Sequence, residues 1–148
     1  MLPTPPPLDA DGNVIPHDHL GILDGDEIIR RVSKQHLVDD PKAIGGRRLS
    51  SSLFNPSSEK NGGVSVDLKR HIEEAGHDPK DYVSNPPWVG SVKLIAQDFR
   101  SMTLKVGYDP IADNPYHGQV WGNFTGGCKN KLLRLAQWFV PIPDEPLS

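Results

Sequence analysis

The stretch Val89-Gly-Ser-Val-Lys-Leu-Ile-Ala96 contains the clearest strand signal in the chain, and it decides the fold class that we predict. A Pro-Pro pair precedes it, and β-branched and apolar side chains of the kind found in strands make up most of it. Further strands are predicted from other short β-branched or alternating runs. These runs cover residues 27–32, 49–54, 64–66, 103–108 and 116–122.

Helical signals lie between and after these strands. Asp67 suits the N-cap of a helix over residues 68–75, and Gly76 suits its termination. Pro79 is placed to begin a second short helix, and an apolar face over residues 129–140 predicts an amphipathic closing helix. Strands and helices mix without a regular βαβ alternation. We therefore predict a single α+β domain with a small, mostly antiparallel sheet and two or three flanking helices.

The chain has 148 residues, a length that suits one domain with its own hydrophobic core. We expect an extended, Pro-rich acidic leader over residues 1–16 and the domain over residues 17–148. The apolar runs are too short to span a bilayer, and the N-terminus lacks the features of a secretory signal. Cys128 is the only cysteine, so no intrachain disulfide can form and a cytoplasmic location is expected.

The formal net charge of −3 is unevenly distributed along the chain. Residues 1–27 hold six acidic residues and neither Lys nor Arg, so the remainder carries a net positive charge. A mildly basic body is compatible with an anionic ligand, whereas a dedicated nucleic-acid module usually shows a clearer basic stripe. A small anion is therefore a better candidate partner than a nucleic acid.

The segment from Gly45 to Asp67 combines two arginines, several hydroxyls and two Gly-Gly pairs, which is a composition suited to holding an anion. Guanidinium groups bind phosphate or carboxylate in a bidentate manner, and hydroxyls and glycine amides add donors. Arg47, Arg48 and Ser50 are therefore candidate ligand-binding residues. A solvated loop, or the polar face of an edge strand, would show the same composition. Neither a phosphate-loop nor a dinucleotide glycine fingerprint is present.

Arg30 and Arg31 end the strand predicted over residues 27–32. Side chains alternate between the two faces of a strand, so one of these arginines points inward, where an unpaired guanidinium would be costly. The inward arginine is therefore expected to pair with a carboxylate or to line a pocket.

His117 lies in Asn114-Pro-Tyr-His-Gly-Gln-Val-Trp-Gly122, between turn residues and the start of a predicted strand. Imidazole titrates near neutral pH, which suits proton transfer, so His117 is the candidate catalytic residue. Tyr116 and Trp121 could form a stacking wall for a base or ring. A structural histidine at the start of a strand is the alternative interpretation.

The other histidines and the cysteine give weaker signals. His17-Asp-His19 brings two metal ligands close together, but two ligands do not make a site, so no metal centre is predicted. His71 is expected on the solvent face of its helix. Cys128 precedes Lys129, which could activate its thiol, although a buried or incidental cysteine is the alternative.

A longer pattern runs through Asp24-Gly-Asp, Arg30-Arg-Val32, Ser52-x-Phe54, Gly63-Val-Ser-Val-Asp67, Asp109-Pro110 and His117-x-x-Val120-x-Gly122. Over about residues 17–122 it resembles a family of short bacterial proteins of unknown function. That resemblance implies no activity, cofactor or catalytic residue.

The chain also places an Arg at the end of an early strand and a Ser in a later Gly-x-Ser-x strand. This order is similar to the layout of ADP-ribosyltransferase-like folds, in which the basic residue and the Ser contact NAD. The resemblance implies Arg31 and Ser65 as ligand-binding residues. Such transferases place an acidic residue on a third strand. This chain has no convincing matching acid after Val92, and Gln119 would be a poor substitute.

Two functions are therefore expected. The first is a cytoplasmic bacterial protein with a polar pocket for a phosphorylated or nucleotide-like ligand, with nucleotidyl or ADP-ribosyl transfer as the reaction class. The second is a non-catalytic protein that binds a partner protein encoded with it, through the leader or the Trp138-bearing end. Convergence of Arg31, Ser65 and His117 in one cleft would favour the first, and an exposed apolar patch would favour the second. The sequence specifies no cofactor.

Overall fold

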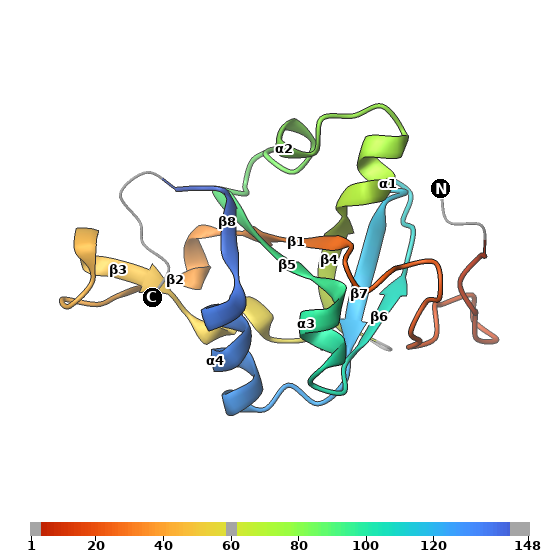
Figure 1. Cartoon of the computed structure of the whole chain (residues 1–148), viewed down its shortest axis with the longest axis horizontal. Coiled ribbons are helices and arrows are strands. Elements are labelled where there is room, and N and C mark those ends of the chain that lie inside the picture. Colours follow the sequence, from red (N-terminus) through yellow and green to blue (C-terminus); the bar gives the residue numbers. More distant parts are fainter. Residues whose placement is uncertain (1–3, 59–61, 143–148) are drawn as a thin grey trace.

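The computed structural model describes residues 4–58 and 62–142, and within them the chain forms a six-stranded and a two-stranded sheet (Figure 1). The strands of the large sheet are β1 (Glu27–Val32), β4 (Val64–Leu68), β5 (Gly90–Ile95), β6 (Lys105–Tyr108), β7 (His117–Trp121) and β8 (Gln137–Val140). They lie in the order β6-β7-β4-β1-β5-β8, and each pairs with its neighbour in the antiparallel sense. The predicted single-domain α+β class is confirmed.

The small sheet pairs β2 (Leu37–Asp39) with β3 (Arg47–Leu49). Short 3-10 helices flank it, namely η1 (Lys34–His36), η2 (Ile44–Gly46) and η3 (Ser51–Phe54). The predicted strand over residues 49–54 is therefore wrong beyond its first residue. The hydroxyl of Ser50 accepts a hydrogen bond from the backbone N–H of Ser52 at 3.1 Å, and this cap starts a helix in place of a longer strand.

The main hydrophobic core lies between the large sheet and three helical segments: η3, α3 (Ala96–Arg100) and α4 (Gly126–Leu135). The buried rings of Phe54 and Phe99 meet edge to face there, with their centroids 6.5 Å apart. A smaller apolar cluster forms around Ile29 of β1, which packs with residues of α1 and the segment after α2. Because β1 is covered on both faces, its apolar side chains are buried at consecutive positions.

Helix α1 (Lys69–Glu74) starts one residue later than predicted, and its N-cap is Leu68 rather than Asp67. Asp67 belongs to β4, and its carboxylate binds an arginine instead of the helix amides. Termination at Gly76 is confirmed, because Gly76 has a φ of +89° and its N–H donates to the carbonyl of Glu73 at 3.0 Å.

Gly76→Ala is expected to lower the free energy of unfolding by about 1 kcal/mol, since only glycine adopts the left-handed backbone without strain. A Cβ at this position would meet no atom within 4 Å, so the cost comes from the backbone alone. Urea denaturation followed by circular dichroism measures it. Gly126→Ala is the matched control, because that position is equally open and its φ is not left-handed. Equal effects of the two substitutions would contradict this account of the helix end.

Helix α2 (Pro79–Tyr82) begins at Pro79 as predicted, and the carboxylate of Asp78 caps it by accepting from the N–H of Lys80 at 3.1 Å. The expectation that His71 of α1 faces solvent is wrong, because its side chain is buried. Burial, the largest cause, and the nearby positive charge of Arg70 lower the pKa of His71.

The predicted closing helix over residues 129–140 is only partly correct. Helix α4 begins earlier, where the hydroxyl of Thr125 accepts from the N–H of Cys128 at 3.1 Å, and it ends at Leu135. The chain then becomes extended and forms β8, which pairs with β5 at one edge of the large sheet. Aromatic and β-branched residues favour this strand, and Trp138 packs against the main core.

Part of the N-terminal segment lies along the outer edge of β6. The N–H of Val106 donates to the carboxylate of Asp18 at 2.9 Å, and the carbonyl of Val106 accepts from the N–H of His19 at 2.9 Å. The N–H of Tyr108 donates to Nε2 of His17 at 3.1 Å. These contacts occupy backbone groups that an edge strand would otherwise leave unpaired. Residues 1–3 of the predicted leader, residues 59–61 and the C-terminal residues 143–148 lie outside the described residues.

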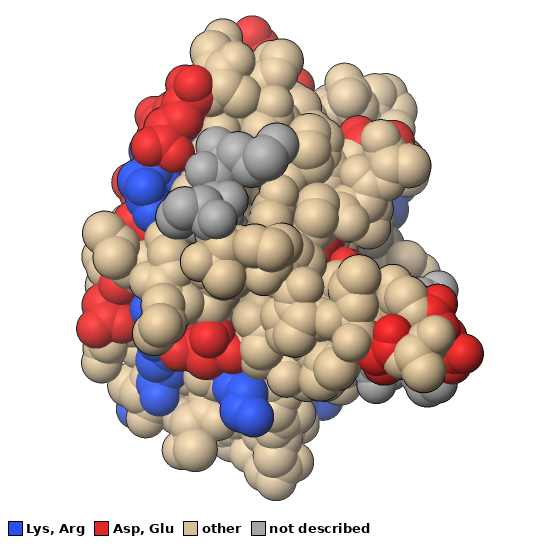
Figure 2. All heavy atoms as spheres, turned by 90° about the vertical axis from the view of Figure 1, so that its right-hand side faces the viewer, with Lys and Arg blue, Asp and Glu red and all other residues tan. Residues whose placement is uncertain are grey.

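Charged side chains on this side of the molecule are interspersed among uncharged ones. Figure 2 shows acidic and basic residues in small separate groups rather than in one basic stripe. This face therefore differs from the surface that is typical of a dedicated nucleic-acid module.

Candidate functional site

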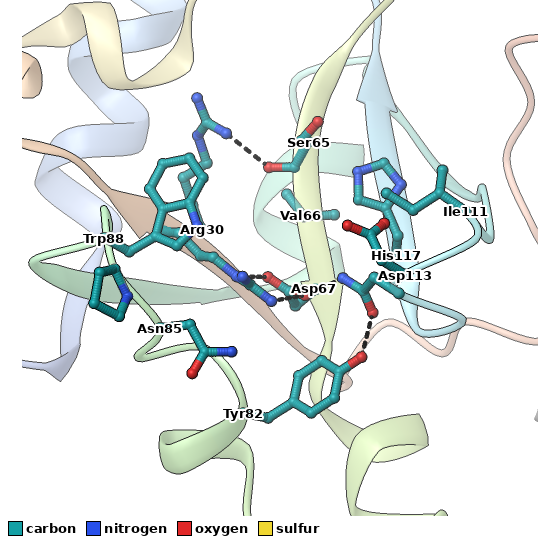
Figure 3. A pocket seen from close by; sticks show the side chains of 13 residues that line it. Arg30, Ser65, Val66, Asp67, Tyr82, Asn85, Trp88, Ile111, Asp113 and His117 are labelled. Atoms are coloured by element: carbon teal, nitrogen blue, oxygen red, sulfur yellow. Dashed lines mark hydrogen bonds and ion pairs between the residues drawn. The ribbon is translucent and has the colours of Figure 1, made fainter.

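A cavity of about 610 Å³ lies beside the two central strands of the large sheet, at the point where their pairing ends (Figure 3). β1 pairs with β5 along its whole length, but it pairs with β4 only through Ile28–Leu68 and Ile29–Asp67. The remaining residues of the two strands are free to line a cavity. Its lining comes from β1, β4, β7, α2 and the loops before β5 and β7: Arg30, Arg31, Ser65, Val66, Asp67, Tyr82, Asn85, Pro86, Trp88, Ile111, Asp113, Asn114 and His117.

Strand register brings the polar residues together. Asp67 of β4 lies directly opposite His117 of β7, so their side chains share a face of the sheet. Ile29 of β1 lies opposite Asp67 on the neighbouring strand. Because every second side chain of a strand points to the same face, Arg31, two residues after Ile29, and Ser65, two residues before Asp67, also lie on this face. Residues that are far apart in the sequence thus surround one space.

The site contains a bidentate ion pair between Arg31 and Asp67. Nε and Nη2 of Arg31 donate to the two carboxylate oxygens at 2.8 Å and 3.0 Å. Nδ2 of Asn114 donates to Oδ1 of Asp67 at 2.8 Å, and the hydroxyl of Tyr82 donates to Oδ1 of Asn114 at 2.9 Å. The residue Asp67 is only 3% exposed, and these bonds compensate for the burial of its carboxylate.

Arg30 has a different environment. Its Nε donates to the carbonyl of Leu53 at 2.9 Å, and its Nη1 donates to the carbonyl of Ser65 at 3.0 Å. Among the described residues, no carboxylate lies within ion-pair distance of it. Burial lowers the pKa of Arg30 to about 10, in spite of the opposing effect of Asp67, so the guanidinium stays charged at neutral pH. The cavity wall therefore holds a guanidinium that makes no ion pair with an acid among the described residues.

His117 is held by Asp109. Nδ1 of His117 lies 2.7 Å from the backbone carbonyl of Asp109 and 3.4 Å from its Oδ2. The amide of Gln119 donates to the same carboxylate. Burial alone would lower the pKa of His117, but its bonds to Asp109 outweigh burial and raise the pKa. With Nδ1 engaged, Nε2 is the ring nitrogen left to interact with a molecule in the cavity.

The predicted site residues fall into two groups. Arg31, Ser65 and His117 line the cavity, and Arg31 fulfils both alternatives for an inward arginine, because it pairs with a carboxylate and also lines a pocket. Arg47, Arg48 and Ser50 lie on or beside β3 and are absent from the cavity lining. The prediction for these three rests on local composition, which does not show how the small sheet sits relative to the large one.

Arg48 and Ser50 have structural partners instead. Nε of Arg48 lies 3.2 Å from a carboxylate oxygen of Asp40, and Ser50 caps η3. Gln119 is also absent from the cavity lining, and its amide group bonds the carboxylate of Asp109 and the N–H of Gly63. The substitute for the transferase acid is therefore not in the site.

Several lining residues were not predicted as site residues. The sequence predicts Asp67 as a helix cap. Strand alternation predicts that only one of the two neighbours Arg30 and Arg31 points inward, and Arg31 is the one that the ADP-ribosyltransferase resemblance implies. Trp88 and Asp113 come from loops whose position depends on the folded sheet. One sequence signal could have identified the ion pair. Ser65 and Asp67 alternate on one predicted strand, and another predicted strand has arginines near its end.

No protein-family model, no curated protein and no solved structure matches this chain. Both resemblances drawn from the sequence therefore stay predictions. Within residues 4–58 and 62–142, there is no group of three or more His, Cys, Asp or Glu side chains that could hold a metal ion. None of the helices in those ranges is long and apolar enough to cross a membrane.

Proposed function

We propose that the cavity binds a small phosphorylated or nucleotide-like ligand. The observation that carries this proposal is the meeting of Arg31, Ser65 and His117, from three different strands, around one space of about 610 Å³. Sites for small organic molecules commonly have volumes of about 300–1000 Å³. The cavity is therefore large enough for more than a bare ion.

Two groups of the lining, Arg30 and His117, favour an anion, whereas the carboxylate of Asp113 opposes it. Asp67 neutralises Arg31, but Arg30 is bonded to backbone carbonyls and keeps its full charge. His117 adds a second positive charge when it is protonated, and its raised pKa extends protonation to higher pH. In a partly buried site these charges act through a lower dielectric than in water, which strengthens their attraction for an anion.

His117 is the residue that we propose to donate a hydrogen bond, or a proton, to the ligand. The arrangement of an imidazole held through Nδ1 by a carboxylate is one that supports general acid or base chemistry at Nε2. We propose ligand binding rather than ADP-ribosyl transfer as the function. Neither Gln119, which bonds elsewhere, nor the Asp67 carboxylate, which pairs with Arg31, is free to act as the acidic residue of such a transferase. Nucleotidyl or ribosyl transfer is the chemistry to test once a ligand is known.

Calorimetric titration of the full chain with ADP, ADP-ribose, pyrophosphate and adenosine tests the proposal. We expect the three anions to bind, with affinity that falls as salt is added, and adenosine to bind far more weakly. Binding of adenosine as tight as that of ADP, or no binding of any of the four, would contradict an anion site. In that case the alternative, a protein-interaction role, would become the better hypothesis.

The affinity for ADP-ribose is expected to fall as the pH rises above 6.5, the ordinary pKa of histidine. Because the pKa of His117 is raised, the ring is protonated below that value and loses its charge only at higher pH. We expect a roughly tenfold loss once the ring is neutral, the usual contribution of a charge-assisted hydrogen bond. The diphosphate of ADP-ribose keeps a constant charge over this range, so the ligand does not contribute.

Calorimetry at a series of pH values measures this dependence. His117→Gln should bind less tightly than the wild type at low pH and should show a flat profile. A flat profile in the wild type, or the same slope in His117→Gln, would exclude His117 as the titrating contact.

A further inference from the structure

The cavity contains one acidic side chain that the proposed anion site does not explain. Asp113 lies at the tip of a tight turn that Ile111 and Asn114 close, with each residue's N–H donating to the other's carbonyl at 3.1 Å. This turn fixes Asp113 in the cavity lining, on the side of His117 and opposite Trp88 (Figure 3). Asp113 makes no hydrogen bond or ion pair to another residue in the described part of the chain.

An unpaired carboxylate beside an anion site has a clear electrostatic consequence. It repels phosphate, so a cavity meant for inorganic phosphate or pyrophosphate alone would be weakened by it. A carboxylate accepts hydrogen bonds and donates none, so it favours a ligand that brings hydroxyl groups to that position. Neighbouring hydroxyls of a ribose supply two such donors, in the manner known for acidic residues in dinucleotide sites.

The opposite wall supports the same class of ligand. Trp88 is half-buried in the loop before β5 and lies on the side of the cavity that also holds Arg30. Indole offers a broad apolar face on which a planar base can stack. The lining thus has an aromatic surface and a positive charge on one side, and a hydrogen-bond acceptor on the other.

We infer that the cavity is selective for ribonucleotides, with the phosphate near Arg30, the ribose hydroxyls at Asp113 and the base against Trp88. This inference rests on the proposed function, because it specifies which phosphorylated compounds the site accepts. Asp113 and Trp88 act as specificity residues, whereas Arg30 and His117 supply the attraction for the anion. Removing the charge of Asp113 should therefore change the affinities for a nucleotide and for a bare anion in opposite directions.

Calorimetry on the wild type and Asp113→Asn tests the inference with three probes: ADP, 2′,3′-dideoxy-ADP and pyrophosphate. We expect Asp113→Asn to bind ADP roughly tenfold less tightly, because hydrogen bonds to a charged acceptor are lost. Pyrophosphate should bind the variant several-fold more tightly, because the repulsion is removed. In the wild type, dideoxy-ADP should bind about as weakly as ADP binds to the variant.

The matched control is Asp39→Asn, an exposed acid on β2 that is outside the cavity lining and should leave all three affinities unchanged. Affinities for ADP and pyrophosphate that move in the same direction in Asp113→Asn, or equal binding of ADP and dideoxy-ADP, would overturn the inference and leave the anion site intact. Failure of both ADP and pyrophosphate to bind the wild type would instead overturn the proposed function itself. Asp113 is exposed at a turn, and a thermal unfolding curve confirms that each variant is folded.

Discussion

Asp67→Asn is expected to lower the free energy of unfolding by about 2–4 kcal/mol. The carboxylate of Asp67 accepts two hydrogen bonds from Arg31 and one from Asn114, and it is almost fully buried. An amide in its place presents an N–H₂ group to a guanidinium that can only donate, and Arg31 is left charged without its partner. Breaking one member of a buried pair costs more than the pair contributes.

Urea denaturation of the variant measures this loss, and Asp40→Asn provides the comparison. Asp40 also pairs with an arginine, Arg48, but both side chains are considerably more exposed, at 25% and 39%. Exposed pairs contribute at most about 1 kcal/mol, so the control should change stability little. If the two substitutions had equal effects, Asp67 could not be the buried centre of the site.

Arg30→Met is expected to weaken ADP binding by roughly 30- to 100-fold, since it removes the one guanidinium in the cavity wall that is bonded only to carbonyls. Arg48→Met removes an equal charge at a distance from the cavity and should change the affinity by less than about twofold. Arg30→Lys keeps the charge and should retain part of the affinity. Calorimetry measures all three, and circular dichroism establishes that each variant is folded.

Equal losses in Arg30→Met and Arg48→Met would show that general charge, rather than the cavity, attracts the ligand. Unchanged ADP affinity in a folded Arg30→Met protein would remove Arg30 from the site.

The strands of the large sheet could largely be predicted from the sequence, because their signal is local. The alternating or β-branched runs that became β1 and β5–β7 each lie within a residue or two of the predicted bounds. The end of α4 could not be predicted in this way. The apolar spacing of Leu132, Leu133 and Phe139 fits a helix, yet the unpaired edge of β5 is available only in the folded protein, and residues 137–140 pair with it.

The same distinction applies to the site. Arg31, Ser65 and His117 lie in or beside predicted strands, where alternation limits the directions that a side chain can take. The prediction for Arg47 and Arg48 rests on arginine, serine and glycine lying close together in the sequence, which does not determine their position in space. The order of the strands decides that β4 lies between β1 and β7, and no local pattern contains that order.

We propose above all that a ligand enters the cavity lined by Arg31, Ser65 and His117. The chain has three tryptophans, of which only Trp88 lines this cavity, so the indole N–H signals in a proton–nitrogen NMR spectrum report directly on the place of binding. Titration with ADP is predicted to shift the Trp88 signal while those of Trp121 and Trp138 stay in place. A spectrum in which no indole signal moves at saturating ADP, or in which only Trp121 or Trp138 responds, would contradict the account.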